Sequence, residues 1–184
     1  MIKLCIANRK CGVSKTTTAV NVSSILVEMG YKVLLIDLDP QGNATDNFGL
    51  NPEELPNTIY HVIAKDLPLD QAICETKFGV DIIPSNTELA YAEIAIANKL
   101  SREKLLSDAI EKANLKYDFV ILDLPPNLGL VSVNGLVAAD KVIITVDVGL
   151  FSLTGIGDLM TLVSLIKGQL NPNLDVIKNK INKL

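Results

Sequence analysis

Short apolar runs of strand length alternate with helix-length segments along most of this chain, and this alternation limits the fold more than any other feature. The runs are rich in Ile, Val and Leu, and most lack the polar alternation of a half-exposed strand; they are 2–7, 33–36, 80–83, 119–122 and 142–146. Strands that are buried on both faces of a parallel sheet have this composition. We therefore expect an α/β fold with a mostly parallel, twisted β-sheet and helices on both of its faces.

Helices are expected between these strands, at 15–29, 87–100, 102–114, 130–138 and 154–169. The segment 43–77 is less periodic and contains three prolines, so we expect short helices and loops there. No linker, repeat or low-complexity tract divides the sequence. The expected organisation is therefore one domain over 1–176, followed by a basic tail over 177–184.

Composition excludes several classes of protein. Apolar residues make up 48% of the chain and charged residues 21%, which argues against intrinsic disorder. The net charge of −4 argues against nucleic-acid binding over the whole surface. The most apolar stretch, 142–166, contains Asp147 and Asp158, so no membrane span is expected. Three cysteines without metal spacing or an even-numbered disulfide framework favour a reducing, cytoplasmic location.

The first apolar run leads into the sequence NRKCGVSKTTT (8–18), and a helix is expected after it. A strand, a loop and a helix that begins with Lys-Thr form a phosphate-binding unit: backbone N–H groups face the phosphates, the lysine adds charge, and the hydroxyl reaches Mg²⁺. The common GxxxxGK[ST] pattern is not met, because Arg9 and Ser14 stand at its two glycine positions. The alternative is a coincidental Lys-Thr pair at a helix start.

Carboxylates follow two further apolar runs. Asp37 and Asp39 flank Leu38 after the second run, and Asp123 follows 119–122. Carboxylates at the ends of buried strands are costly unless they are hydrogen-bonded or face a cation, although capping of turns or helices remains an alternative. Ligands of open parallel sheets bind beyond the carboxyl ends of the strands. We therefore expect these groups to meet at one site for a triphosphate and Mg²⁺.

Together these stretches resemble the ParA/Soj-type partition ATPases, a P-loop branch of the deviant Walker A family that also contains MinD. The loop is similar to the deviant Walker A box, usually written KGGVGKTT, with Cys11 and Ser14 in place of two glycines. DLDPQGN (37–43) and YDFVILDLPPNLGLVSVNGL (117–136) also match, and DPQGN favours chromosome and plasmid partition over MinD. The likeness runs from residue 1 to about 176.

The resemblance implies roles for individual residues. The nucleotide-binding set is Lys10, Cys11, Gly12, Val13, Ser14, Lys15, Thr16 and Thr17. Lys10, Lys15 and Asp39 form the implied catalytic set: Lys10 reaches the phosphates of a partner subunit, Lys15 binds those of its own subunit, and Asp39 positions the attacking water. Thr16, Asp39 and Asp123 are the implied Mg²⁺ residues, and Asp37 lies nearby in the same switch segment.

The function implied by the resemblance is DNA partitioning by a homodimer that forms on ATP binding and hydrolyses Mg-ATP to ADP and phosphate. A centromere-binding, ParB-like protein is the implied partner. Nonspecific DNA binding would place the protein on the nucleoid, but relatives carry their usual DNA-binding region beyond the end of this sequence. A second interpretation is a shortened, catalytically impaired paralogue that regulates a fuller relative by dimerising with it. Cys11 and Ser14 favour this second interpretation.

Overall fold

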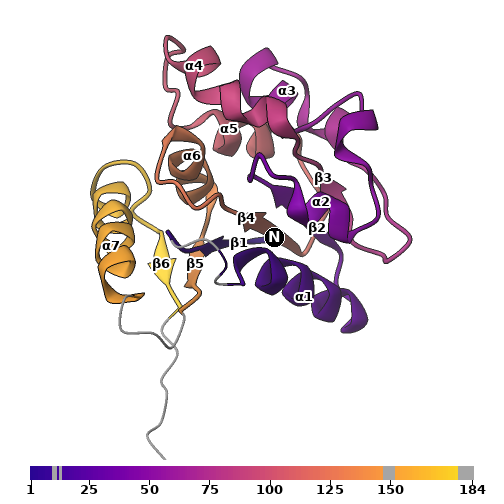
Figure 1. Cartoon of the computed structure of the whole chain (residues 1–184), viewed down its shortest axis with the longest axis horizontal. Helices are drawn as coiled ribbons and strands as arrows, with labels where there is room; N and C mark the ends of the chain where they lie inside the picture. The colour runs from indigo at the N-terminus through magenta and orange to yellow at the C-terminus, as the bar shows by residue number, and fades with distance from the viewer. Residues whose placement is uncertain (10–11, 13, 147–151, 178–184) are drawn as a thin grey trace, which may run out of the picture.

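The computed structural model describes residues 1–9, 12, 14–146 and 152–177. Within these residues, six strands form one sheet in the order β3-β2-β4-β1-β5-β6 (Figure 1). The strands are β1 (Ile2–Ala7), β2 (Val33–Asp37), β3 (Asp81–Ile83), β4 (Phe119–Asp123), β5 (Lys141–Ile144) and β6 (Asp175–Val176). Every neighbouring pair is parallel, so the expected α/β class is confirmed.

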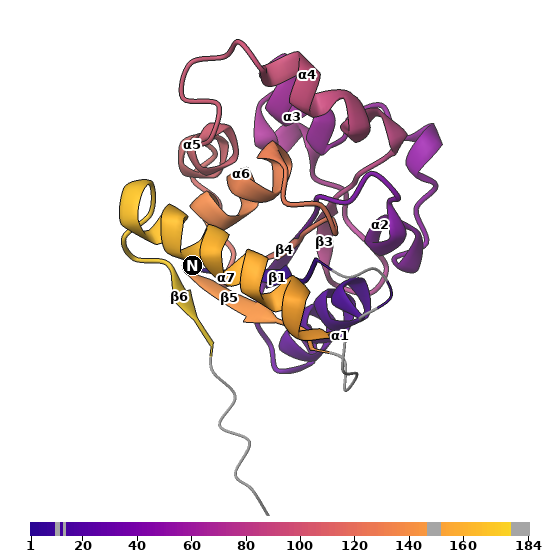
Figure 2. The ribbon, with the colours of Figure 1, turned by 60° about the vertical axis from the view of Figure 1, so that its left-hand side comes forward.

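Helices connect the strands and cover both faces of the sheet. They are α1 (Lys15–Glu28), α2 (Asn43–Asn47), α3 (Ile59–Lys65), α4 (Ala92–Ile96), α5 (Leu105–Lys112), α6 (Leu130–Ala138) and α7 (Ser152–Gln169). Three short 3₁₀ helices complete the described elements: η1 (Pro52–Glu54), η2 (Leu69–Ala72) and η3 (Thr87–Tyr91). Figure 1 shows α1 on one side of the sheet and α3, α5 and α6 on the other, and α7 lies alongside β5 (Figure 2).

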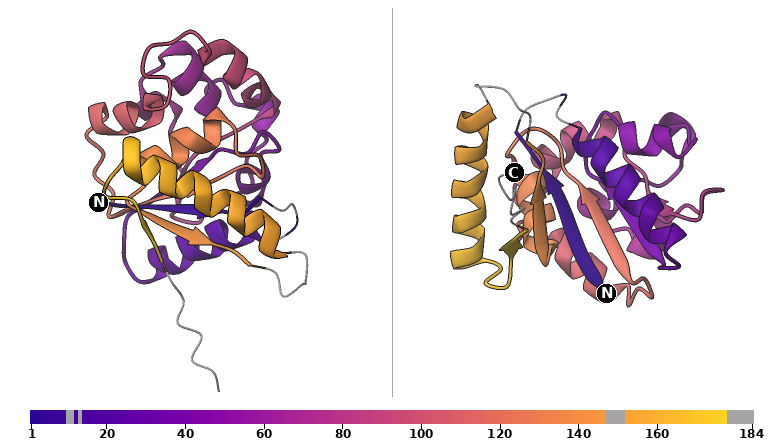
Figure 3. Two further views of the ribbon diagram at one scale, coloured as in Figure 1. Left: turned by 90° about the vertical axis from the view of Figure 1, so that its left-hand side faces the viewer. Right: turned by 90° about the horizontal axis from the view of Figure 1, so that it is seen from below.

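Alternate residues of each strand supply two separate cores. In β1, Leu4 and Ile6 belong to the apolar cluster that includes Ala19 of α1. Cys5 and Ala7 belong to the larger cluster on the opposite face, together with residues of α3 to α7. Figure 3 shows the sheet between these two layers. Burial on both faces explains why the strands lack polar alternation.

Three elements differ from the expectation. The single helix expected over 87–100 is instead η3 followed directly by α4, which ends at Ile96. Leu89, Ala92 and Ile96 are buried, but no side chain over 97–100 is, so nothing apolar anchors a longer helix. The helix expected from 102 begins at Leu105, after Ser101 adopts a left-handed φ of 50°. β6 was not predicted because two residues carry no periodic signal.

The strand register places three chain segments at the same edge of the sheet. Asp37 of β2 pairs with Asp123 of β4, and Asp123 pairs with Ile6 of β1. The bonding continues past the strand ends, because Leu38 N donates to Asp123 O at 2.9 Å and Leu124 N donates to Ile6 O at 3.2 Å. The loops after β1, β2 and β4 therefore start side by side.

Helix α6 packs directly against two of these loops at Gly135. A Cβ atom on Gly135 would lie 3.0 Å from Leu38 Cδ1 and closer still to Leu124 Cδ2. Leu38 and Leu124 are the residues that directly follow Asp37 and Asp123. The position of α6 is therefore coupled by close contact to the backbone around both carboxylates.

Candidate functional site

A cavity of about 480 Å³ lies beyond the carboxyl ends of the central strands. Its walls come from the loop after β1, the first turn of α1, the loop after β2, α2 and the loop after β4. The lining residues are Gly12, Ser14, Lys15, Thr16, Thr17, Asp39, Gln41, Asn43, Asn47 and Pro126. Segments far apart in the sequence thus form one polar site beyond the carboxyl ends of the strands, where ligands of open parallel sheets bind.

The loop between β1 and α1 contributes the backbone of this cavity. Lys15 is the first residue of α1, and only 7% of its surface is exposed. Ser14 precedes it with a left-handed φ of 56°, a conformation that costs a non-glycine residue about 1–2 kcal/mol. The Ser14 side chain forms no capping bond among the described residues, which leaves the helix N-terminus facing the cavity. The predicted residues Lys10, Cys11 and Val13 lie outside the described part of the chain.

Asp37 is fully buried and organises the loop after β2. Its carboxylate accepts hydrogen bonds from Asp39 N at 3.1 Å, Thr45 N at 3.0 Å and Thr45 Oγ1 at 2.8 Å. Burial raises the pKa of Asp37 to about 6, and these three bonds hold that pKa down in part. Asp37 does not line the cavity. Its hydrogen bonds instead stabilise the backbone of residues 38–45.

Asp39, two residues later, lines the cavity and is 8% exposed. Its Oδ1 accepts a hydrogen bond from Gln41 N at 3.0 Å, which fixes the turn that follows. Gln41 itself lines the cavity, as do Asn43 and Asn47 at the two ends of α2. The two aspartates of this segment therefore occupy different environments, one inside the protein and one at the site.

Asp123 is buried beside the cavity, and neither of its carboxylate oxygens has a hydrogen-bond partner among the described residues. Burial, followed by repulsion from Asp37, raises the pKa of Asp123 to about 7. The Thr16 hydroxyl and the Lys15 ammonium group lower the pKa of Asp123 in part. The distance and angle between Thr16 and the Asp123 carboxylate do not meet the criteria for a hydrogen bond. An unpartnered buried carboxylate next to a polar cavity fits a cation that binds with the ligand.

The raised pKa of Asp123 predicts how the nucleotide-free protein responds to pH. The folded state binds more protons than the unfolded state between the ordinary pKa near 3.8 and the raised value of about 7. Stability should therefore fall as the pH rises through this window and stay lower above it. Asp123→Asn removes the buried charge, so we expect it to be more stable than wild type by about 2 kcal/mol above this window. Urea unfolding at about pH 5, 6, 7 and 8 measures this difference.

The exposed Asp70 in η2 provides the control. Asp70→Asn should follow the wild-type dependence on pH, because its side chain is already in water. Parallel curves for Asp123→Asn and wild type would contradict a raised pKa at Asp123.

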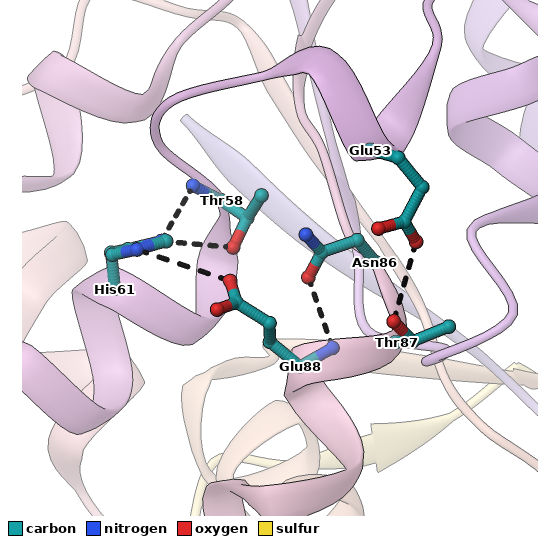
Figure 4. A network of polar contacts seen from close by, with 6 residues as sticks. All are labelled: Glu53, Thr58, His61, Asn86, Thr87 and Glu88. Carbon is teal, nitrogen blue, oxygen red and sulfur yellow. Dashed lines mark hydrogen bonds and ion pairs between the residues drawn. The ribbon is translucent and has the colours of Figure 1, made fainter.

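A network of polar contacts joins α3 to the 3₁₀ helices η1 and η3 (Figure 4). Thr58 N donates to His61 Nδ1 at 3.2 Å, and His61 Nε2 lies 3.9 Å from Glu88 Oε2. Thr87 Oγ1 donates to Glu53 Oε1 at 3.3 Å. These contacts join η1, α3 and η3. His61 therefore has a capping position in the structure, outside the cavity lining.

Sequence reasoning missed several residues of the site. Gln41, Asn43, Asn47 and Pro126 line the cavity, and Thr45 connects Asp37 to Ser85 N after β3 at 3.1 Å. Gln41, Asn43 and Pro126 lie in the stretches 37–43 and 117–136 that carry the resemblance, but a motif does not show which of its side chains turn toward a ligand. Thr45 and Asn47 lie outside these stretches. The close approach at Gly135 carried no signal in a single sequence.

Comparison with known proteins identifies the family. A family model described as an AAA domain (AAA_31) matches residues 1–176. The sporulation initiation inhibitor protein Soj of Bacillus subtilis is 39% identical over 172 residues, which cover 93% of this chain and 68% of Soj. This chain belongs to the ParA/Soj family. The chromosome partitioning protein ParA of Myxococcus xanthus is 37% identical over 172 residues, 93% of this chain and 61% of that protein. The chain thus spans about three fifths to two thirds of the length of these ParA/Soj relatives.

A solved structure shares the fold. Cobyrinic acid a,c-diamide synthase from Mycobacterium smegmatis, with bound ADP and magnesium, has a TM-score of 0.92 and 36% sequence identity. The match covers 96% of this ParA/Soj chain and 72% of the synthase. Within the described residues, no helix is both long and apolar enough to cross a membrane.

Proposed function

We propose that this chain is a partition-type ATPase that binds Mg-ATP in the cavity described above and hydrolyses it to ADP and phosphate. The observation that carries this proposal is the meeting of Lys15, Thr16 and Asp39 on one cavity, with the unpartnered carboxylate of Asp123 beside it. The partition functions in the names of its relatives and the ADP and magnesium of the synthase support it.

Phosphate binding is assigned to the loop after β1 and the start of α1. Lys15 supplies a positive charge that is largely shielded from water, and backbone N–H groups at the helix N-terminus face the same cavity. Gly12, Ser14, Thr16 and Thr17 complete the described part of this set. Cys11 and Val13 join the set by their place in the loop, and Lys10 is proposed to reach the nucleotide of a partner subunit.

Thr16, Asp39 and Asp123 are the residues proposed to hold Mg²⁺. Among the described residues no cluster of three or more His, Cys, Asp or Glu side chains could hold a metal ion alone. Protein sites for Mg²⁺ commonly use one or two carboxylates together with nucleotide phosphates and water, which fits this set. When bound, the ion would neutralise phosphate charge during transfer.

Asp39 is the residue proposed to position the attacking water, because it lines the cavity while Asp37 does not. The Asp37 carboxylate accepts hydrogen bonds from Asp39 N and from the backbone N–H and hydroxyl of Thr45, so it fixes the loop that carries Asp39. Phosphoryl transfer depends mainly on such positioning and on charge neutralisation. The protein thus supplies orientation at three points: Lys15 for the phosphates, Asp39 for water and Asp37 for the loop.

The proposal includes a nucleotide switch. The ATP-bound chain forms a homodimer in which Lys10 contacts the partner's phosphates, and a centromere-binding, ParB-like protein acts on that dimer. Residues 1–176 act as the ATPase domain and 177–184 as a basic tail, in the cytoplasm. The whole chain carries a net charge of −4, so nonspecific DNA binding is proposed only for a local basic surface.

Calorimetry with Mg-ATP, combined with mass measurement with and without nucleotide, tests this function. Binding with a Kd of about 100 µM or tighter, with dimer formation, is the expected result. Phosphate release by the same sample tests hydrolysis. A chain that neither binds Mg-ATP nor changes its mass would contradict the proposal.

A second candidate is a regulatory paralogue that binds nucleotide weakly and acts by dimerising with a relative. The observation that favours it is the left-handed Ser14, since this backbone conformation is costly for any residue except glycine. Weak or absent Mg-ATP binding by the wild-type chain, together with dimer formation with a longer ParA relative, would support this candidate.

Ser14→Gly is expected to tighten Mg-ATP binding about fivefold, because the left-handed conformation costs serine about 1 kcal/mol more than glycine in the phosphate-binding loop, and a nucleotide-free loop that leaves this conformation avoids that cost. Cys11→Gly in the same chain should increase the gain if that position also approaches phosphate. Ser101→Gly is the matched control, since Ser101 also has a left-handed φ (50°) but does not line the cavity. Calorimetry measures all three. Equal affinities for Ser14→Gly and Ser101→Gly would show that strain at Ser14 does not weaken binding.

A further inference from the structure

The loop after β4 is anchored at its far end by a side chain from another helix. Glu93 of α4 accepts a hydrogen bond at Oε1 from Leu130 N, the first residue of α6, at 2.9 Å. Gly129, the residue at the N-cap of α6, has no side chain that could cap the helix itself. A carboxylate at this place also interacts favourably with the positive end of the helix. Glu93 therefore caps α6 from outside.

The backbone at Gly129 is shaped to admit this carboxylate. The three atoms nearest to a Cβ on Gly129 all belong to Glu93: they are Oε1, Cδ at 2.8 Å and Oε2 at 3.1 Å. Any residue larger than glycine would therefore collide with the carboxylate or displace it. The two positions fit each other and form one contact between α4 and the start of α6.

This contact lies at the end of a loop that reaches the nucleotide cavity. The loop starts after Asp123, and its residue Pro126 lines the cavity. Ser132 Oγ of α6 donates to Asn127 O, which ties the loop to the first turn of the helix. Gly135, about one and a half turns along α6, packs against Leu124 and Leu38. A movement of the α6 N-terminus would therefore shift Asp123 in two ways: through the backbone of the loop after β4, and through the contact of Gly135 with Leu124.

From this geometry we propose that Glu93 is a positioning residue for the loop after β4. It acts through Leu130 and Gly129, holds Pro126 at the cavity wall and keeps Asp123 in register with the site. Its effect on catalysis rests on the function proposed above. The anchor itself does not need nucleotide, so it is tested separately.

Hydrogen exchange of the Leu130 amide in the nucleotide-free protein tests the anchor. Glu93→Ala removes the acceptor, so exchange at Leu130 should become at least about tenfold faster. Glu93→Gln keeps an acceptor oxygen and should stay within about threefold of wild type. Ile94→Gln is the control, because Ile94 is on the same helix and is 78% exposed. Unchanged exchange at Leu130 in Glu93→Ala would overturn the proposal.

Steady-state kinetics test the positioning role. Glu93→Ala should lower kcat about tenfold and change KM for ATP by less than about twofold, and Glu93→Gln should restore most of kcat. Gly129→Ala should lower kcat by a similar factor in the wild-type background. In the Glu93→Ala background the added methyl group meets no carboxylate, so Gly129→Ala should cost less than about twofold there.

The outcomes separate the two proposals. Faster exchange at Leu130 with unchanged kcat would make Glu93 a structural cap only and overturn its positioning role. Multiplicative effects of Gly129→Ala and Glu93→Ala would overturn the contact between them. A wild-type chain that does not hydrolyse Mg-ATP would contradict the proposed function and remove the kinetic role of Glu93, while the exchange at Leu130 would still decide the anchor.

Discussion

Lys15→Ala is expected to weaken Mg-ATP binding by at least about 100-fold. Lys15 lines the cavity with only 7% of its surface exposed, so its charge acts on phosphate with little screening by water. Loss of one partner from a buried ion pair costs about 3–5 kcal/mol, which corresponds to a factor of this size or larger. Calorimetry with Mg-ATP measures the change.

Lys32→Ala is the matched control, because Lys32 is an exposed lysine that precedes β2 at the opposite edge of the sheet. Its affinity for Mg-ATP should equal that of wild type. Thermal unfolding of both variants confirms that they are folded at the temperature of the titration. Tight binding by folded Lys15→Ala would contradict the role of Lys15 in the site.

Asp39→Ala is expected to lower kcat for ATP hydrolysis by at least about 100-fold and to change the Kd for Mg-ATP by less than about fivefold, because Thr16, Asp123 and the phosphates still hold the ion. Asp39 presents a carboxylate at the cavity wall, where a water molecule that attacks phosphate must be oriented. Phosphate release under saturating Mg-ATP measures kcat, and calorimetry measures the Kd of the same protein.

Asp46→Ala provides the comparison for this effect. Asp46 is in α2, close in sequence to the lining residues Asn43 and Asn47, but it is exposed and does not line the cavity. It should retain wild-type kcat. Full activity of Asp39→Ala, or an equal loss in Asp46→Ala, would show that the carboxylate of Asp39 does not position the water.

Much of the fold could be predicted because each strand of the sheet centre carries its own local signal. β1 has the predicted bounds, Ile2–Ala7, and β2 and β4 extend the predicted runs by one residue each, to Asp37 and Asp123. The prediction failed where local signal and tertiary packing disagree. Residues 87–100 form η3 and a short α4, because only Leu89, Ala92 and Ile96 find buried places there.

The site was harder to predict than the fold. The phosphate loop and the carboxylates follow from residue type and strand position alone, but the different environments of Asp37 and Asp39 do not. Both residues follow the same apolar run, and only the folded α2 segment shows that Thr45 covers Asp37 and leaves Asp39 at the cavity. Glu93 was missed for the same reason, since its partner Leu130 is 37 residues away.

The central claim is that groups from three strand ends form one site for a triphosphate and its metal ion. The most direct measurement is a crystal structure with a non-hydrolysable ATP analogue and Mn²⁺, whose anomalous signal locates the ion. We expect a single peak between the Thr16 hydroxyl and the Asp123 carboxylate, with the phosphates against Lys15. A peak elsewhere, or a nucleotide bound in a different cavity, such as the one lined by Tyr31 and Tyr117, would contradict it.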